Sequence, residues 1–398
     1  MSRILGQERA IRILEDALRS GRFHHGWIFS GPRGVGKFTT ALEVARVLLD
    51  QTHPLAPGSA GGSEGGTPLI GSMWKSDVQN RIDAGTHPDL HIIRKEMALY
   101  SDNRELRERK LLNIPLDLLR ERLLGGRSGE TVHEAAAYRT PAMGVGKSFI
   151  IDEAELLQPE AQNAMLKTLE EPPANTWIFL ITSLPNRLLA TIHSRCQQVR
   201  FERLDDRAMA EWWKSELARD RAAPTDEPSS RKKKVVFDPK AVPPATVKWS
   251  IEFAGGAPGI ALLAMEYGFH DWHKALEPML HELDRGQFPT SMGELLGTIV
   301  EEFAQAWVAR HGKDSTSKDA ANKDGARHAL SLLAAHARLR LKEAAGRPSQ
   351  SEFAERWALS IDLLRECERQ IESNVNQKLA MENLAAQWAA ALSGAIAV

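Results

Sequence analysis

Cysteine is nearly absent from this sequence, in which Cys196 and Cys367 are the 2 thiols among 398 residues. Two cysteines exclude both a disulfide framework and a four-cysteine zinc site. The chain contains 51 basic and 52 acidic side chains, so its net charge is close to zero. No global field therefore draws the protein to nucleic acid or to a membrane, and any contact with DNA requires a local patch.

Long hydrophobic runs are also lacking. No apolar stretch reaches the length of a transmembrane helix, and no signal-peptide pattern opens the sequence, so we expect a cytoplasmic protein without a membrane partner. Apolar residues make up 42% of the chain and charged residues 26%, which is typical of globular proteins. The chain is too long for one compact domain, and its length predicts two or three.

The first chemical signal is the stretch WIFSGPRGVGKFTTALEVA at residues 27–45. An apolar strand, a glycine-rich turn and the start of a helix follow one another, which is the context of a phosphate-binding loop. The turn fits the pattern G-x-x-x-x-G-K-[ST] except at its last position. Backbone N–H groups and the lysine of such a loop hold nucleotide phosphates. The candidate nucleotide-binding residues are Gly31, Gly34, Val35, Gly36, Lys37, Phe38 and Thr39.

Phenylalanine replaces the hydroxyl residue that should end this motif. The hydroxyl normally ligates Mg²⁺, and Phe38 has no oxygen to offer. Thr39 is a poor substitute, because one position along a helix turns the side chain by about 100°. We therefore expect inefficient hydrolysis. Binding of ATP or ADP stays open, with Mg²⁺ present only where a nucleotide binds.

A second signal is the apolar strand FIIDEAE at residues 149–155, which contains two successive acids. In P-loop ATPases the first acid holds Mg²⁺ and the second polarises the attacking water. Asp152 and Glu153 are the candidates for these roles, active or vestigial. The nearby stretch MGVGKS also resembles a phosphate loop, but a strand follows it where a helix should begin. We interpret it as a turn that leads into the strand.

Apolar strands alternate with helices as far as Phe201, which predicts a parallel sheet between two layers of helices. Strand signals fade beyond that point, and from about Trp272 the pattern is helical. Polar insertions are predicted at 51–71 and 221–244, and the basic run within the second reads as a solvated loop. An apolar stripe packs either within its own domain or against neighbouring subunits. Its members are Leu359, Leu363, Cys367 and Ile371.

Several segments resemble the bacterial clamp loader, the AAA+ assembly that opens the sliding clamp of the replicative DNA polymerase. They are ILGQERA, the phosphate loop, HPDL, the acidic strand, QNAMLKTLEEPP, the triplet Ser194-Arg195-Cys196, GGAPGIAL and NVNQKLAMENL. The resemblance implies an α/β P-loop AAA+ core at 1–204, a small helical lid at 205–268 and an all-helical collar domain at 269–398. It also implies gamma/tau and delta subunits as partners, together with the sliding clamp, and primer–template DNA reached through the assembly.

Three departures separate the sequence from the ATP-hydrolysing gamma/tau subunits of that family. Those subunits carry threonine after the loop lysine, four zinc-binding cysteines and an arginine in the lid. Here the corresponding features are Phe38, no cysteine before Cys196, and Gly259. The resemblance therefore implies a stator subunit without zinc, which completes the clamp-loading ring, and polymerase chemistry would belong to another subunit.

Arg195 receives its role from the same resemblance. It would be an arginine finger that enters the ATP site of a neighbouring subunit and stabilises charge there. A purely structural arginine on the same loop is the other interpretation. The alternative for the whole chain is an active AAA+ ATPase, either a divergent gamma/tau-type motor or another remodeller. A P-loop kinase lacks support, because no acceptor-substrate site accompanies the loop.

Overall fold

The structure is a computed structural model that describes residues 4–53, 70–71, 75–108, 111–218, 237–311, 317–345, 351–373 and 375–394. The chain divides into two compact units. The first comprises Met1–Thr225 with Ala254–Ile260, and the second comprises Asp226–Phe253 with Ala261–Val398. Within the described ranges, no helix is both long and apolar enough to cross a membrane.

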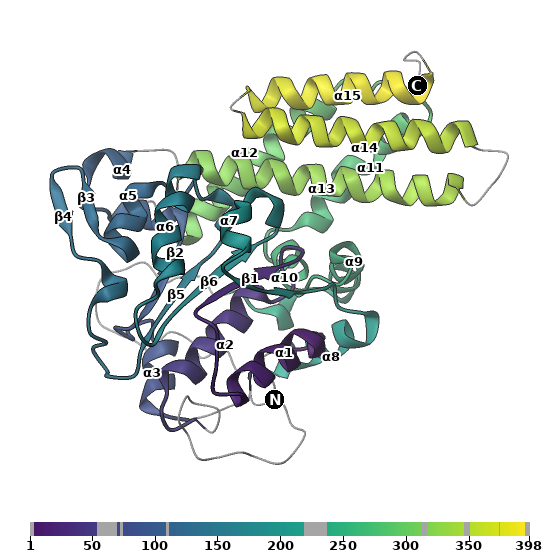
Figure 1. Cartoon of the computed structure of the whole chain (residues 1–398). Helices are drawn as coiled ribbons and strands as arrows, with labels where there is room; N and C mark the ends of the chain where they lie inside the picture. Colours follow the sequence, from purple (N-terminus) through teal and green to yellow (C-terminus); the bar gives the residue numbers. More distant parts are fainter. Residues whose placement is uncertain are drawn as a thin grey trace, which may run out of the picture. The chain divides into compact units, whose positions relative to one another are not determined.

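A five-stranded sheet forms the centre of the first unit, with the strand order β2-β5-β6-β1-β7 (Figure 1). The strands are β1 (Gly26–Ser30), β2 (Leu90–Ile93), β5 (Lys147–Ile151), β6 (Thr176–Thr182) and β7 (Gln197–Arg200). Every neighbouring pair is parallel. All carboxyl ends therefore lie at one edge of the sheet, and the predicted parallel α/β core is confirmed.

The sequence of the central strands explains their position. Every residue of β5 and β6 is buried, as expected for parallel strands covered on both faces. Aromatic rings fill the centre: Phe29 lies 5.7 Å from Phe179 and 5.2 Å from Phe201 between ring centroids. These rings belong to an apolar core that also includes buried residues of the flanking helices.

Helices cover the sheet of the first unit (Figure 1). They are α1 (Glu8–Arg19), α2 (Lys37–Leu49), α3 (Asp77–Asp83), α4 (Arg104–Glu108), α5 (Leu116–Leu119), α6 (Pro159–Glu170), α7 (Ala190–His193) and α8 (Asp206–Ala218). Helix α6 starts with proline, which needs no hydrogen-bond acceptor at that position. The short antiparallel pair β3 (Gly126–Ser128) and β4 (Thr131–His133) was not predicted.

The two predicted insertions fall largely outside the described residues. Residues 54–69 and 219–236 are not described, and the basic run Arg231 to Lys234 belongs to the second stretch. The described chain resumes at Phe237 and enters a short 3₁₀ turn at Pro239–Ala241.

Helices alone make up the described part of the second unit, as predicted for the collar. They are α9 (Pro244–Ala254) and α10 (Pro258–Glu266), each of which crosses a unit boundary, then α11 (Phe269–Asp284), α12 (Met292–His311), α13 (Lys318–Ala345), α14 (Ser351–Glu372) and α15 (Gln377–Ser393). Helix α13 packs against α12 and α14, and α15 packs against the same two helices. The predicted lid and collar boundaries stay a prediction.

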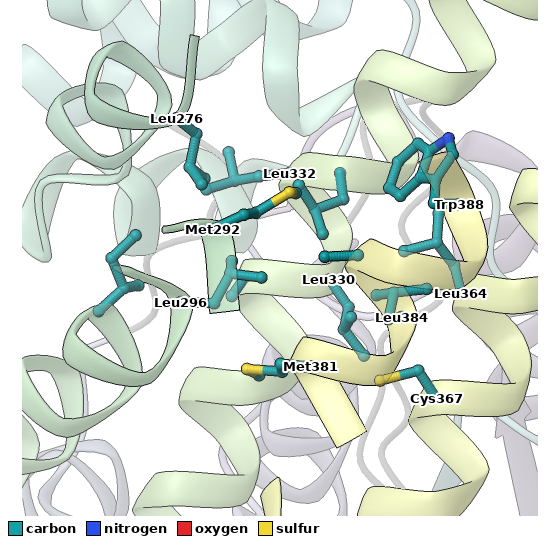
Figure 2. Packing of buried hydrophobic residues seen from close by; sticks show 14 of the residues in the cluster. Leu276, Met292, Leu296, Leu330, Leu332, Leu364, Cys367, Met381, Leu384 and Trp388 are labelled. Atoms are coloured by element: carbon teal, nitrogen blue, oxygen red, sulfur yellow. The ribbon is translucent and has the colours of Figure 1, made fainter. Parts of the chain in front are cut away.

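The core of this helical unit contains part of the predicted apolar stripe of α14, but Leu359 is half-buried and is not a member of it. Cys367 and Ile371 are buried in it, and Leu363 packs against it from the side. The stripe thus contributes to its own unit. Helices α11 to α15 all contribute to this core. Figure 2 shows side chains that meet there, among them Leu276, Met292, Leu296, Leu330, Leu364, Cys367, Met381, Leu384 and Trp388.

Candidate phosphate-binding site

The phosphate loop joins the carboxyl end of β1 to the first residue of α2. Gly31, Gly34 and Gly36 have φ angles of 147°, 75° and 98°, a region that L side chains rarely adopt. A Cβ atom on Gly31 would lie 2.2 Å from the carbonyl oxygen of Phe201. The curled loop therefore depends on its glycines.

Backbone donors are available along this loop. In the described part of the chain, the N–H groups from Gly34 to Thr39 donate no backbone hydrogen bond, and the first such bond of the helix runs from Thr40 to Gly36. Unpaired N–H groups at a helix start carry partial positive charge and suit an anion.

Lys37 begins α2 and points back into the loop. Its Nζ donates to the carbonyl oxygens of Gly31 at 2.7 Å and Pro32 at 2.5 Å. Burial lowers the pKa of Lys37 to about 8, although the charges of Glu155 and Asp152 oppose the shift. The ammonium therefore lies in a desolvated position where only neutral carbonyl groups accept its hydrogen bonds.

Phe38 takes part in a contact that the sequence did not suggest. Its ring packs against the apolar core of the first unit. The guanidinium of Arg94 lies over this ring, with Cζ 4.3 Å from the ring centroid. The Nε of Arg94 also donates to Oδ2 of Asp152 at 3.1 Å. One guanidinium thus bridges the residue after the loop lysine and the first of the two acids.

Sheet register brings this arginine to the site. Arg94 directly follows β2, whose last residue, Ile93, is paired with Ile151 of β5. The N–H of Asp152 donates to the carbonyl of Ile93 at 3.0 Å. The available signal was a cation at the end of an apolar strand, but the sequence did not reveal that β2 lies beside β5.

Both predicted acids are held by cations. Burial raises the pKa of Asp152, and the Arg94 charge partly offsets that rise. Glu153 has a left-handed φ of 53°. Its carboxylate pairs with Nη2 of Arg33 at 3.0 Å and with Nζ of Lys95 at 3.1 Å. A carboxylate in this arrangement is engaged on both oxygens and is poorly placed to polarise a water molecule.

A third acid, Glu155, was not predicted as a site residue. Its Oε1 accepts a hydrogen bond from the hydroxyl of Ser183 at 2.5 Å, and it lies 3.8 Å from Arg33 Nη2. Burial alone would raise the pKa of Glu155, but the hydrogen bonds from Ser183 and Thr182 lower it. The hydroxyl of Ser183 is therefore committed to a carboxylate, so it is not free to contact a phosphate in this arrangement.

The fold family implies Mg²⁺ at such a loop, and the side chains here offer few oxygen ligands for it. Mg²⁺ requires an octahedral shell of oxygen ligands. Phe38 supplies none, and the Asp152 carboxylate already binds Arg94. The residues present therefore do not fit Mg²⁺. Within the described ranges, no group of three His, Cys, Asp or Glu side chains could hold another metal ion.

A family model described as DNA polymerase III, delta subunit, matches residues 6–205, half of the chain. The chain belongs to this clamp-loader family. It is 33% identical to DNA polymerase III subunit tau of Salmonella typhimurium over 202 residues, 51% of this chain and 25% of that protein. It is also 32% identical to subunit delta' of Escherichia coli over 179 residues, 45% of this chain and 42% of that protein.

A further relative is subunit delta' of Bacillus subtilis, 29% identical over 203 residues, 51% of this chain and 50% of that protein. The match thus spans at most half the length of these relatives. The clamp-loader family recognised in the sequence is confirmed, and both tau and delta' subunits stand among the relatives.

Two further contacts fix the loop in this clamp-loader chain. The N–H of Gly259 donates to the carbonyl of Gly34 at 2.8 Å, and a Cβ on Gly259 would lie 3.0 Å from the Gly34 Cα. The side chain of Gln7 donates to the carbonyls of Val35 at 3.2 Å and Glu202 at 2.7 Å. Gln7 belongs to the segment ILGQERA, but its contact with the loop was not predicted.

Arg195 of this clamp-loader chain lies far from its own phosphate loop. Its carbonyl oxygen would be 3.4 Å from a Cβ on Gly26, the first residue of β1, whereas the loop leaves the last residue of that strand. Five strand residues span about 13 Å. The Arg195 side chain pairs with Glu170 at 2.5 Å and donates to the carbonyl of Thr191 at 2.9 Å. It lies at the opposite edge of the sheet from Lys37.

Proposed function

We propose that this chain is a stator subunit of the delta-prime type, which completes the clamp-loader ring without hydrolysing ATP itself. The observation that carries the proposal is the Arg94 guanidinium between Phe38 and Asp152. The proposed partners are gamma/tau and delta subunits, the sliding clamp, and primer–template DNA reached through the assembly. The chain would act in DNA replication in the cytoplasm.

The arrangement of the acids argues against the alternative, an ATPase in its own right. Hydrolysis at a P-loop requires a metal ion on the phosphates and an oriented water molecule. Arg94 engages the acid that would hold the metal, and Glu153 is paired with Arg33 and Lys95. An active motor would have to break these ion pairs in every catalytic cycle.

Arg195 supports a contribution across a subunit boundary. Because it lies at the far edge of the sheet, it cannot serve its own loop. Its ion pair with Glu170 is exposed, with side chains 32% and 48% accessible, so releasing it costs about 0–1 kcal/mol. An arginine finger accelerates phosphoryl transfer by about 10³ to 10⁵, or about 4–7 kcal/mol. The gain in a neighbour's site would far exceed the cost of release.

ATP turnover in a reconstituted clamp loader tests the proposal. We expect no turnover from the isolated chain. In the complex that carries Arg195→Ala, we expect a large loss of turnover at the ATP site that Arg195 enters. Arg195→Lys should not restore the rate, because a lysine lacks the planar fork of donors. Arg207→Ala is the matched control, since the Arg207 side chain is 88% exposed and pairs with Glu211 one turn away on the same helix.

Two results would contradict the proposal. Turnover by the isolated chain would show that the ion pairs of Asp152 and Glu153 open readily. An unchanged rate with Arg195→Ala, in a complex of normal composition, would make this arginine a structural residue.

A further inference from the structure

Arg94 contacts the two residues whose counterparts ligate Mg²⁺ in P-loop proteins. In P-loop proteins, Mg²⁺ lies between the residue after the loop lysine and the acid at the end of the neighbouring strand. Here the same two positions are Phe38 and Asp152, and the Arg94 guanidinium contacts both, over the ring at 4.3 Å and to Oδ2 at 3.1 Å. An aromatic ring suits a guanidinium, because its face attracts cations.

This arrangement excludes a second cation from the same place. A divalent ion bound to Asp152 would lie beside the positive charge of Arg94 and would find no oxygen on Phe38. Mg²⁺ also gives up its water shell reluctantly, and this site offers too few oxygen ligands to replace the lost waters. The guanidinium, by contrast, brings its own charge without an ion from solution.

The cationic side chains around the loop differ in whether they are already paired with a carboxylate. Arg94 is paired with Asp152, Arg33 is paired with Glu153, and Lys95 is paired with Glu153. In the described part of the chain, Lys37 forms no ion pair, and its ammonium donates only to the carbonyls of Gly31 and Pro32. In the same described part of the chain, the backbone N–H groups from Gly34 to Thr39 donate no backbone hydrogen bond and are available to an anion.

We infer that this loop is a site for a metal-free polyphosphate anion, in which Arg94 takes the place of Mg²⁺. The inference rests on the proposed loss of hydrolysis and names the ligand class of the same site: the phosphates of ADP or ATP, or inorganic pyrophosphate. Lys37 and the loop N–H groups bind the anion, and Arg94 supplies positive charge beside it.

Calorimetric titration of the full chain tests this inference. ADP and pyrophosphate are titrated separately, once in EDTA and once in excess Mg²⁺. We expect binding in EDTA that is as tight as in Mg²⁺, or tighter, because Mg²⁺ sequesters the free anion in solution. Equal affinity for pyrophosphate and ADP would assign recognition to the loop alone, and tighter binding of ADP would add a nucleoside contact.

A double variant should reverse the effect of Mg²⁺ on ADP binding. Phe38→Thr with Arg94→Ala provides a hydroxyl and frees Asp152, so Mg²⁺ should strengthen ADP binding by about tenfold or more. Arg207→Ala should behave as wild type, and circular dichroism checks that each variant folds. Should the double variant not fold, the wild-type comparison decides alone.

Two outcomes would overturn the inference: wild-type binding that requires Mg²⁺, or no binding of either anion in EDTA. Neither outcome would affect the stator proposal, which is decided by ATP turnover in the complex. Conversely, ATP hydrolysis by the isolated chain would end the stator proposal even if anions bind in EDTA.

Discussion

Replacing Asp50 by asparagine should destabilise the first unit by about 2–3 kcal/mol at neutral pH. Asp50 follows α2 and is 1% exposed. Its Oδ1 accepts hydrogen bonds from Thr52 N at 3.0 Å and Thr52 Oγ1 at 2.6 Å. Its Oδ2 accepts from Ser76 Oγ at 2.5 Å and, more weakly, from Gln79 Nε2 at 3.5 Å. An asparagine keeps one acceptor oxygen and turns an amide donor toward the other donors.

The magnitude follows from the charge of the acceptor. Hydrogen bonds to a charged group contribute about 1.5–3 kcal/mol each, and neutral ones about 0.5–1.5 kcal/mol. The variant loses the bonds to one oxygen and the charge assistance of the others. Thr52 is exposed and can bind water again, which keeps the total below the sum of the single bonds. The network joins the residue before the predicted 51–71 insertion to Ser76 behind it.

The effect should depend on pH in a defined direction. Burial would raise the pKa of Asp50, but hydrogen bonds from Ser76 and Thr52 lower it below the ordinary value of 3.8. A lowered folded-state pKa means that the charged form contributes stability above the unfolded-state value, and that this contribution is lost as pH falls through the folded-state value. The difference between wild type and Asp50→Asn should therefore be complete at neutral pH and shrink below about pH 4.

Hydrogen exchange in increasing urea, measured on peptides that cover residues 37–53, gives the unfolding free energy of this region alone. Glu134→Ala is the control, because the Glu134 side chain is 81% exposed and its ion pair with Arg139 lies at the surface. A variant within about 0.5 kcal/mol of both wild type and control would show that the Asp50 network does not stabilise this region.

Two further results are expected. Gly31→Ala should lower the free energy of unfolding by more than about 2 kcal/mol, because the φ of Gly31 is 147° and a Cβ would lie 2.2 Å from the Phe201 carbonyl oxygen. A melting temperature equal to that of the wild type would contradict this. Burial raises the pKa of Cys196 to about 12 and that of Cys367 to about 11, so a thiol reagent at pH 8 should label neither cysteine before unfolding. Rapid labelling of native protein would show that one of them is accessible.

The central strands could be predicted from the sequence because parallel strands buried on both faces are continuous apolar runs. The edge strand β7 could not. Its residues Gln197–Arg200 include one buried side chain, Val199, among exposed polar ones. A four-residue edge strand gives neither an apolar run nor a clear alternation, so only its pairing with β1 reveals it.

The same distinction applies to the site. Gly31, Gly34, Gly36 and Lys37 are close in sequence, so their pattern could be recognised directly. Arg94 and Asp152 are 58 positions apart and meet because β2 lies beside β5. Strand order is a property of the whole sheet, and local patterns do not contain it.

Two of the expected departures from a motor subunit, Phe38 and Gly259, lie in or against the phosphate loop. Phe38 is one face of the Arg94 site, and Arg94 in turn neutralises Asp152. Gly259 lies so close to Gly34 that a side chain there would need the loop to move. Threonine at position 38 alone would leave Arg94 on the acid. Removing Arg94 alone would leave the half-buried Asp152 carboxylate without its ion-pair partner, which is costly. The proposed loss of hydrolysis is therefore a property of this packed cluster, and no single substitution would be sufficient to reverse it.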